Sequence, residues 1–559
     1  MKNAILIALI VSAGLACSKA DGDHDQGQKE KVKHGRIDKA DHTSKVPFYT
    51  FSDQLEEQQM ELAGNPLLQR FKASREELSS DPYRPIYHYV NPEGNLNDPN
   101  GLCYWQGRWH LFYQAYPPED PRQHWGHAAS PDLIHWEDLP LAIYPNPEER
   151  CHSGQILVEE DRVIAAYSGF TYGLMIAVSS DPLLLNWEKL ELNTIDAHTG
   201  KPTNRPGGDA CIWREGDYYY VLSGGKQGKG AKRKRTASLH RSKNLVDWEV
   251  NIHNFLENDR FAMLGDDGAC PNFWPIGDRH MLLSFSHATG GNYSLGDYDT
   301  QSQRFKVTDY GRFNFGGIYE PGAVLAPSSC PDGKGGINVM FNLAYAKSTN
   351  GWNQIMSLPR KLTLLSEREI AMEPTGEIES LRTNHQQIRH LTIPANQEIL
   401  LEKIQGNAME IKTVIEVGKA QHVEVNVLRS PNKEEYTKIS FWGNRGIRDY
   451  DRYEGWEYDQ WIDAKYSLIS LDNSRSSILP EAMSNPPETG PFYLKQGEPL
   501  ELRIFIDRSV VEVFANGRQC VAVRVYPSLE KSTGVSLRAQ GSAANIISLD
   551  AWQMRNIYK

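Results

Sequence analysis

The sequence predicts an all-β protein in which a β-propeller of four or five blades precedes a β-sandwich. Three observations support this prediction. Residues 86 to about 365 form short apolar segments separated by turns rich in Gly, Pro, Asn and Asp. A motif recurs within this region, and beyond it the pattern changes to a regular alternation of apolar and polar residues.

The recurring motif defines the blades. Its copies run from Ser130 to Glu137, from Ser180 to Glu188 and from Ser242 to Glu249, and in each copy a Trp precedes the final Glu. A degenerate fourth copy covers residues 295–299. Recurrence at a nearly constant spacing in strand-rich sequence is typical of propellers, with roughly 40 to 65 residues in each blade. Residues 81–370 are therefore assigned to a propeller.

The sandwich is predicted for residues 383–559. Apolar and polar residues alternate there, which places one face of each strand in a core and the other in water. Asn516-Gly517 between two such segments predicts a tight hairpin. The clearest alternating segments are 409–417, 422–428, 500–507 and 510–514.

The first 80 residues divide into three segments. An apolar run from Ala4 to Ala16 follows Met1-Lys2 and ends at Cys17, which predicts a signal peptide of the lipoprotein type over residues 1–17. We expect export with a lipid anchor at Cys17 rather than plain secretion, and therefore a cell-envelope, secreted or periplasmic location. Residues 18–46 are polar and predict a tether. Residues 47–80 predict short helices interrupted near Gly64-Asn65-Pro66.

Composition excludes several functional classes. A chain of 559 residues is too long for one core, and its net charge of −11 argues against nucleic acid or an anionic membrane surface as the main partner. The one basic cluster, residues 226–235, predicts an exposed hairpin tip. The six cysteines after Cys17 lack the spacing of a zinc site, and the sequence leaves their disulfide state open.

Three aspartates are candidates for catalysis because each stands at a turn that leads into a strand. They are Asp98 in Asn-Asp-Pro-Asn-Gly, Asp209 in Gly-Gly-Asp-Ala-Cys, and Asp267 in Gly-Asp-Asp-Gly-Ala-Cys-Pro. A propeller collects the starts of its inner strands around one axial funnel, so we expect the three to meet there from equivalent places in successive blades. A retaining glycosidase needs one ionised carboxylate as nucleophile and one group that transfers a proton.

The chain also resembles glycoside hydrolase family 32, the invertases, inulinases, levanases and related β-fructosidases. The resemblance rests on the motifs at residues 97–101, 110–114, 124–136, 151–154, 358–364 and 502–514. It implies a five-bladed propeller followed by a β-sandwich, and retaining hydrolysis of terminal fructofuranosides with no metal or other cofactor. Asp98 matches the family's nucleophile and Asp209 its transition-state stabiliser. The residues that match its sugar pocket, or lie beside those that do, are Asn97, Gln114, Trp125, His152, Ser153 and Gly208.

Two departures from the family pattern affect this expectation. Gly208 stands where the family has the Arg of Arg-Asp-Pro, and Ala269 stands where it has the acid/base Glu before Cys-Pro. Alanine transfers no proton, and loss of a positioned acid typically costs roughly 10²- to 10⁴-fold in rate. The sequence offers Asp267 as the first replacement, because two residues along a strand restore the same face, and Glu320 as the second. Asp266, or no acid at all, stays open as well.

The sequence therefore predicts a glycosidase that acts on β-fructosides such as sucrose or a fructan. Two alternatives stay open: a sugar-binding protein that has lost turnover, and a furanosidase for a different sugar. The linkage cleaved, the exo or endo mode and the oligomeric state are not set by the sequence.

Overall fold

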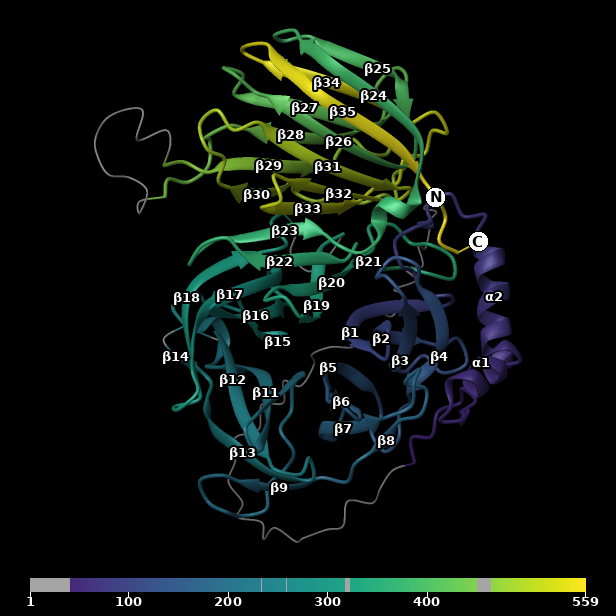
Figure 1. Ribbon diagram of the computed structural model, residues 1–559, viewed down its shortest axis with the longest axis vertical. Coiled ribbons are helices and arrows are strands. Elements are labelled where there is room, and N and C mark those ends of the chain that lie inside the picture. Colours follow the sequence, from purple (N-terminus) through teal and green to yellow (C-terminus); the bar gives the residue numbers. More distant parts are fainter. Residues whose placement is uncertain (1–40, 233, 258, 317–321, 450–463, 559) are drawn as a thin grey trace, which may run out of the picture. The chain divides into compact units, whose positions relative to one another are not determined.

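The computed structural model describes residues 41–559 apart from 233, 258, 317–321, 450–463 and 559 (Figure 1). Five sheets follow one another along the chain up to Pro374, and two six-stranded sheets form the remainder. The predicted five-bladed propeller followed by a β-sandwich is confirmed. The predicted signal peptide with Cys17 lies outside the described residues, as does most of the tether.

Each of the first five sheets is one blade. Blade 1 comprises β1 (Asn95–Trp105), β2 (Arg108–Tyr116), β3 (His124–Ser130) and β4 (Glu137–Ile143). Blade 2 comprises β5 (Cys151–Val158), β6 (Val163–Gly169), β7 (Gly173–Ser179) and β8 (Glu188–Lys189). Blade 3 comprises β10 (Ala210–Glu215), β11 (Tyr218–Gln227), β12 (Lys234–Ser242), β13 (Asp247–Asn254) and, parallel to β13, β9 (Asn193–Asp196).

The last two blades have the same plan. Blade 4 comprises β15 (Ala269–Ile276), β16 (Arg279–Ser286), β17 (Gly290–Asp299), β18 (Arg304–Arg312) and the short β14 (Leu256–Glu257). Blade 5 comprises β19 (Val324–Pro331), β20 (Ile337–Leu343), β22 (Arg360–Leu364), β23 (Ile370–Pro374) and the short β21 (Ile355–Met356). Contacts between successive inner strands run from β1 to β5, β10, β15, β19 and back to β1. The inner strands therefore form a closed ring around one axis.

The recurring motif is the turn between the third and fourth strands of a blade. In blade 1 the Asp132 carboxylate accepts the N–H groups of Ile134 and His135. Asp181, Asn244 and Asp299 accept backbone N–H groups in the same way in blades 2, 3 and 4. A short polar side chain that bonds the backbone just ahead of it closes such turns, which explains the repetition of the motif.

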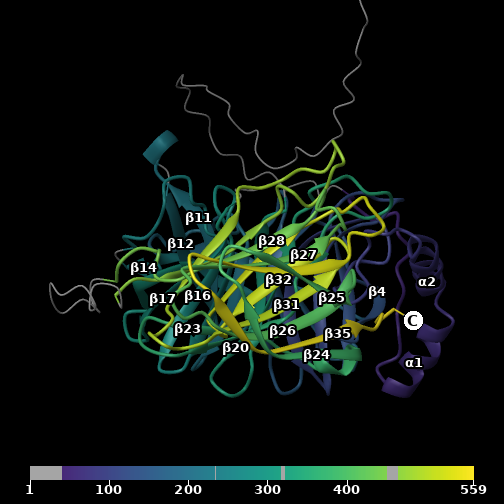
Figure 2. The same cartoon turned by 90° about the horizontal axis from the view of Figure 1, so that it is seen from above.

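Two helices precede the first blade, α1 (Leu55–Ala63) and α2 (Pro66–Leu78). The Asn65 side chain accepts the N–H groups of Leu67 and Leu68, so it caps α2, and Pro66 occupies the first helical position. Figures 1 and 2 show α2 beside β4. Two short 3₁₀ segments, η1 (Gly230–Lys232) and η2 (Ile378–Leu381), complete the helical structure of the described residues.

In the sandwich, two antiparallel sheets, whose strand order does not follow the sequence, pack over a core of mainly aliphatic residues. One sheet contains β24 (Arg382–Ile393), β35 (Ala544–Met554), β26 (Ala408–Glu416), β31 (Leu500–Asp507), β32 (Val510–Ala515) and β33 (Gln519–Arg524). The other contains β25 (Glu398–Gln405), β34 (Gly534–Gln540), β27 (His422–Arg429), β28 (Thr437–Trp442), β29 (Ser467–Asp472) and β30 (Glu488–Phe492). Asn516 and Gly517 turn the chain between β32 and β33 with φ of 49° and 59°, which confirms the predicted hairpin.

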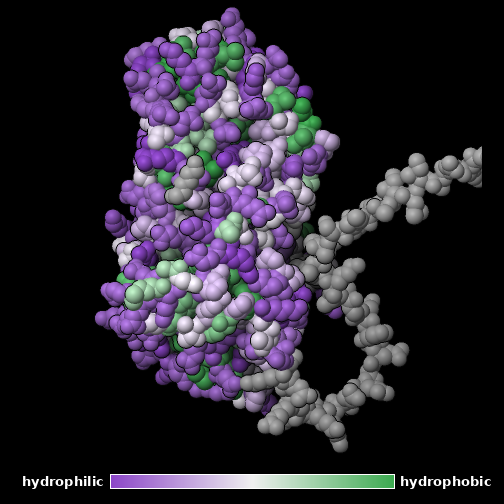
Figure 3. Space-filling view, turned by 90° about the vertical axis from the view of Figure 1, so that its right-hand side faces the viewer, coloured by the Kyte–Doolittle hydropathy of each residue, from purple (hydrophilic) through white to green (hydrophobic). Residues whose placement is uncertain are grey.

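The surface of the described residues is largely polar on the face seen in Figure 3, where hydrophobic side chains gather only in small groups. Among the described residues, no helix combines the length and apolar character needed to cross a bilayer. The six cysteines after Cys17 are all buried free thiols.

A buried ionic network joins the sandwich to the propeller. Glu512 on β32 accepts hydrogen bonds from Arg360 Nη2 at 2.7 Å, Leu358 N at 2.7 Å and His88 Nε2 at 3.1 Å. The side chains of Arg360, Glu512 and His88 have no exposed surface. Burial opposes ionisation of Glu512, but the charge of Arg360 and the bond from His88 outweigh it and hold its pKa at about 2.

We expect Glu512→Gln to lower the stability of the protein by about 3–5 kcal/mol, because it leaves Arg360 charged, buried and uncompensated. Thermal unfolding at neutral pH measures the effect, with Glu501→Gln on the exposed face of β31 as the control. The depressed pKa means that this stabilisation is present above the ordinary Glu pKa of 4.5 and is lost as pH falls towards 2. Equal unfolding temperatures for the two variants would contradict this.

Candidate active site

Irregular backbone marks one end of the inner strands. The ladder of β1 shifts register between Leu96 and Pro99, that of β5 between Cys151 and Gly154, and that of β15 between Ala269 and Asn272. Such β-bulges re-aim side chains and are common beside active sites. The three bulges contain Asp98, Ser153 and Cys270 respectively.

Asp98 is held by hydrogen bonds from blades 1 and 2. Its Oδ2 accepts a bond from Ser153 Oγ at 2.6 Å and lies 3.4 Å from Gln114 Nε2, which also donates to Ser153 Oγ at 2.7 Å. Cys270 Sγ lies 3.5 Å from the same oxygen. Asp98 remains partly exposed while these partners are buried. The cluster therefore fixes one carboxylate oxygen and leaves part of the group open to solvent.

Asp209 meets Asp98 across Cys270. Asp209 Oδ2 accepts the backbone N–H of Cys270 at 3.0 Å and lies 3.6 Å from its Sγ. Cys270 has a positive φ of 48°, so the bulge turns its N–H towards Asp209 while its side chain reaches both carboxylates. The structure thus brings Asp98 and Asp209 together. They come from blades 1 and 3, with Asp267 at blade 4, so the expectation of three successive blades was wrong: blade 2 contributes Ser153 instead.

Burial controls the ionisation of this group. It raises the pKa of Asp98 above its usual range, although the Ser153 bond and the charge of His287 oppose the rise. It raises the pKa of Asp209 to about 6, with the charge of Asp98 adding to the effect. Burial also raises the pKa of the Cys270 thiol, which stays protonated.

Asp267 is held by His287 and Lys226. Its Oδ2 lies 2.7 Å from His287 Nδ1 and 3.2 Å from Lys226 Nζ, and its Oδ1 accepts the backbone N–H of His287 at 3.1 Å. Burial opposes ionisation of Asp267, but these bonds and charges prevail and lower its pKa. Asp267 is therefore an ionised carboxylate at neutral pH.

The residues expected to line a sugar pocket differ in their exposure to solvent. Asn97 Oδ1 lies 3.1 Å from Gln354 Nε2, and Asn97 and His152 are both partly exposed. Trp125 was expected to line the pocket as well, but it has no exposed surface. Trp125 lies on β3 between β2 and β4, where it packs against Cys151 and Tyr167 of blade 2, and its Nε1 donates to the His152 carbonyl at 2.9 Å. Trp125 thus supports the Ser153 segment from beneath.

Gly208 is fixed by backbone packing. It has φ of 92°, and a Cβ at this position would lie 2.2 Å from the carbonyl oxygen of Gly224. A Cβ on Gly224 would in turn lie 2.2 Å from the carbonyl oxygen of Gly268. The backbones of blades 3 and 4 therefore touch beside Asp209, and this arrangement has no room for an Arg side chain at residue 208.

We expect Gly208→Ala to destabilise the protein by about 1–3 kcal/mol or more, because it combines backbone strain with a clash against Gly224. Gly207→Ala is a matched control, since a Cβ there meets nothing within 4 Å. Thermal unfolding of the two variants measures the difference. A Gly208→Ala protein as stable as Gly207→Ala would show that these backbones are free to separate.

Glu320, the second replacement for the missing acid, lies outside the described residues. Within the described ranges, no group of three or more His, Cys, Asp or Glu side chains is arranged to hold a metal ion.

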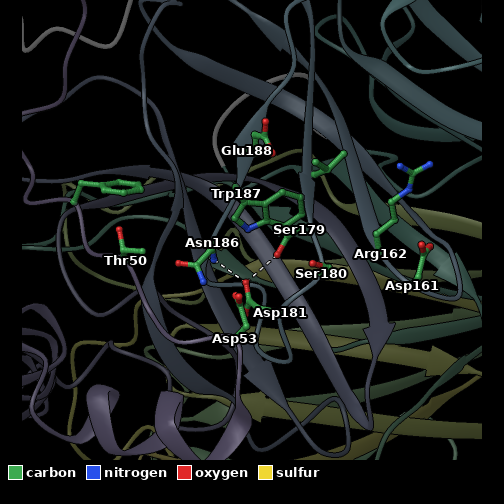
Figure 4. A pocket seen from close by; sticks show the side chains of 12 residues that line it. Thr50, Asp53, Asp161, Arg162, Ser179, Ser180, Asp181, Asn186, Trp187 and Glu188 are labelled. Carbon is green, nitrogen blue, oxygen red and sulfur yellow. Dashed lines mark hydrogen bonds between the residues drawn. The ribbon is translucent and has the colours of Figure 1, made fainter.

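A separate hollow of about 540 Å³ lies at the edge of blade 2 and shares no residue with the Asp98 cluster (Figure 4). Asp181 lines this hollow and accepts hydrogen bonds from Ser179 Oγ at 3.0 Å and Asn186 N at 2.8 Å. Phe48 and Thr50 close it from the segment before α1. Its polar groups serve the recurring turn of blade 2, so the hollow reflects the packing of the N-terminal segment.

Nothing in the sequence indicated His287. The basic cluster lies at the tip of the β11–β12 hairpin, and its described residues are exposed as predicted, except that Arg235 is buried and pairs with Asp259 at 2.6 Å and Asp266 at 3.4 Å. Lys226 points to Asp267. The fold provides the link: Ala269 faces Phe285 in the ladder of β15 and β16, and just beyond that pair Asp267 is hydrogen-bonded to His287.

Comparisons with known proteins agree with this architecture. Residues 88–374 match the model described as glycosyl hydrolases family 32 N-terminal domain, and residues 377–553 match the C-terminal model of the same family. A fructan 6-exohydrolase from Beta vulgaris is 27% identical, over 85% of this chain and 87% of its own. A levanase from Bacillus subtilis is 28% identical, over 85% of this chain and 71% of its own.

Solved structures show a similar fold. Fructan 1-exohydrolase IIa from Cichorium intybus matches with a TM-score of 0.70 and 20% identity, over 85% of this chain and 98% of its own. An exo-inulinase from Aspergillus awamori matches with a TM-score of 0.64 and 19% identity, over 86% and 99%.

Proposed function

Because the chain belongs to glycosyl hydrolases family 32, we propose that it cleaves terminal β-fructofuranosides, of the fructan or sucrose type, by retaining double displacement. One observation carries the proposal: Asp98 and Asp209 lie on either side of Cys270, with Asp98 fixed by Ser153 and Gln114. Retaining displacement requires a carboxylate fixed as nucleophile, which Asp98 provides, and Asp209 is a second carboxylate placed to stabilise positive charge beside it.

The roles follow from the environments. Asp98 attacks C2 of the fructosyl unit and forms an ester, and water then releases fructose from it. The bond from Ser153 fixes the carboxylate for attack, which removes an orientation cost from the reaction. Asp209 hydrogen-bonds the sugar hydroxyls and stabilises the positive charge that develops on the ring. Asn97 and His152 are partly exposed and contact the substrate from β1 and β5.

A second candidate function is sugar binding without turnover. Ala269 motivates it, because this position holds no proton donor. Gly208 motivates a variant of the first proposal, a furanosidase for a different sugar, since Gly stands where the family pattern has a cationic Arg. The same scaffold supports either outcome.

One experiment separates these functions. The purified protein is incubated with sucrose, inulin, levan and aryl β-fructofuranosides, and the products and their initial anomeric form are followed by NMR. Release of β-fructose supports the proposal. Binding of fructan by calorimetry with no product from any substrate would favour the sugar-binding function, and turnover of only non-fructose furanosides would favour the third.

We also propose that the protein is exported and anchored by lipid at Cys17. The apolar run that ends at this cysteine supports the proposal. Metabolic labelling with radioactive palmitate in a bacterial host tests it, with Cys17→Ser as the control. Label on the wild type alone is expected, whereas unlabelled protein in the medium would indicate plain secretion.

A further inference from the structure

We propose that His287 transfers the proton in place of the missing Glu, with Asp267 and Lys226 as its positioning residues. This inference rests on the proposed function and assigns the step that Ala269 leaves unfilled. It moves the acid/base role from Asp267, where the sequence placed it, to the histidine that Asp267 holds.

Strand pairing brings the histidine to the vacant position. Ala269 faces Phe285 in the ladder of β15 and β16. Two residues further, beyond the ends of both strands, the Asp267 carboxylate accepts the backbone N–H of His287 at 3.1 Å and lies 2.7 Å from the ring Nδ1. The imidazole is therefore fixed close to Ala269, directly after the end of β16 in the same blade.

Exposure distinguishes the two side chains. The Asp267 side chain is 6% exposed and the His287 side chain is 46% exposed. Asp267 is thus beneath the ring, and the imidazole is the part of the pair that a substrate in the funnel reaches. A group that protonates a leaving oxygen must come within hydrogen-bond distance of it, which favours the exposed member.

The charges around His287 suit a proton donor. Asp267 contacts His287 within blade 4, Lys226 of blade 3 contacts Asp267, and the charges of Asp98 and Asp209 act on His287 from blades 1 and 3. Burial disfavours the imidazolium, but the Asp267 bond and the three negative charges outweigh it and raise the pKa of His287. The same contacts lower the pKa of Asp267 and keep it ionised, so Asp267 carries no proton to donate.

The step balances with these groups alone. As Asp98 attacks C2, the C2–O bond to the leaving group breaks and the proton on His287 Nε2 passes to that oxygen. This leaves a fructosyl ester on Asp98, a neutral imidazole and a free alcohol. Water then attacks C2, its proton returns to Nε2, and the ester bond breaks to give fructose and the Asp98 carboxylate. Asp267 stays ionised and fixes the tautomer through Nδ1.

The competing interpretation is a structural ion pair, and the chain offers a control for it. His385 Nε2 lies 2.8 Å from Asp550 in the sandwich, and the His385 side chain is also 46% exposed. His385→Gln therefore removes an exposed histidine–aspartate pair outside the candidate site.

The test compares wild type with His287→Gln, Asp267→Asn and His385→Gln on sucrose and on an aryl β-fructofuranoside with a good leaving group. Sucrose needs protonation of its leaving oxygen and the aryl substrate needs little. We expect His287→Gln to lower kcat/KM for sucrose by roughly 10²- to 10⁴-fold and for the aryl substrate by less than about tenfold. The loss of sucrose activity at high pH, which is the basic limb of the kcat/KM profile, is expected to be absent in His287→Gln. Asp267→Asn keeps that limb but moves it to lower pH, and His385→Gln changes neither.

Other outcomes overturn the proposal. A His287→Gln enzyme that retains sucrose activity and the basic limb excludes a role in proton transfer. Equal losses on both substrates, with a folded protein by circular dichroism, indicate a binding role instead. A basic limb lost in Asp209→Asn but kept in His287→Gln assigns the proton to Asp209. If wild type releases no fructose from either substrate, the proposed function itself fails and this assignment fails with it.

Discussion

Asp98→Asn is expected to reduce fructoside hydrolysis by on the order of 10⁴- to 10⁶-fold, because it removes the nucleophile and leaves the rest of the site in place. Asn has the same shape, so Ser153 and Gln114 still have an oxygen to contact at this position. Its amide does not form the ester intermediate. The loss is expected in kcat for both sucrose and aryl substrates, since formation of the ester precedes release of any leaving group.

The comparison uses Asp217→Asn, which removes an exposed carboxylate from the turn between β10 and β11. This control is expected to match wild type in kcat/KM and in unfolding temperature. Fructan binding by Asp98→Asn, measured by calorimetry, separates lost chemistry from a lost site. Retention of a tenth or more of wild-type turnover would show that Asp98 is not the nucleophile.

Asp209→Asn is expected to affect activity and stability in opposite directions. Loss of one preorganised stabilising group costs roughly 10²- to 10³-fold in kcat. Burial and the nearby Asp98 charge raise the pKa of Asp209 to about 6, so its ionised form is unfavourable in the folded protein. The native state then holds more protons than the unfolded state between the ordinary pKa of 3.8 and pH 6, and stability falls as pH rises through that range.

Removal of this charge is expected to increase stability at pH 7 by on the order of 1–3 kcal/mol. Below pH 4 the two proteins should unfold at the same temperature. Thermal unfolding at pH 4 and pH 7, together with kcat at pH 7, measures both effects. An Asp209→Asn protein less stable than wild type at pH 7 would mean that the Cys270 N–H bond outweighs the cost of the charge.

Much of the fold was predictable because local rules act within short stretches. The recurring turn could be recognised since Asp132, Asp181 and Asn244 each bond the backbone a few residues ahead. The same holds for Asn516-Gly517 in its hairpin. Closure of the ring into five blades instead followed from the resemblance to a family, because the fifth blade carries no clear copy of the motif.

Residues of the candidate site could be predicted only where a motif within one short segment identifies them. Asp98 stands in a specific motif of its own. His287 carries no motif and belongs to the site through pairing of β15 with β16, which no local pattern around residue 287 indicates. Trp125 illustrates the reverse error: its motif was found, but burial depends on the blade packed against it. The backbone contact between Gly208 and Gly224 is likewise a property of the packed fold.

A histidine donor has a consequence for the working range of the enzyme. Asp209 must be ionised to stabilise the ring, which sets the acidic limb near its pKa of about 6. The raised pKa of His287 sets the basic limb above the ordinary histidine value of 6.5. Activity is therefore expected to be highest between these two limits.

The central claim is that Asp98 forms a covalent ester with the sugar. The direct measurement is rapid acid quenching of wild type during turnover of an aryl β-fructofuranoside, followed by peptide mass spectrometry. The account predicts one hexosyl unit, that is a hexose less one water, on the peptide that contains Asp98. It predicts none on that peptide in Asp98→Asn. An unmodified Asp98 peptide during active turnover, or a sugar ester on another residue, would contradict it.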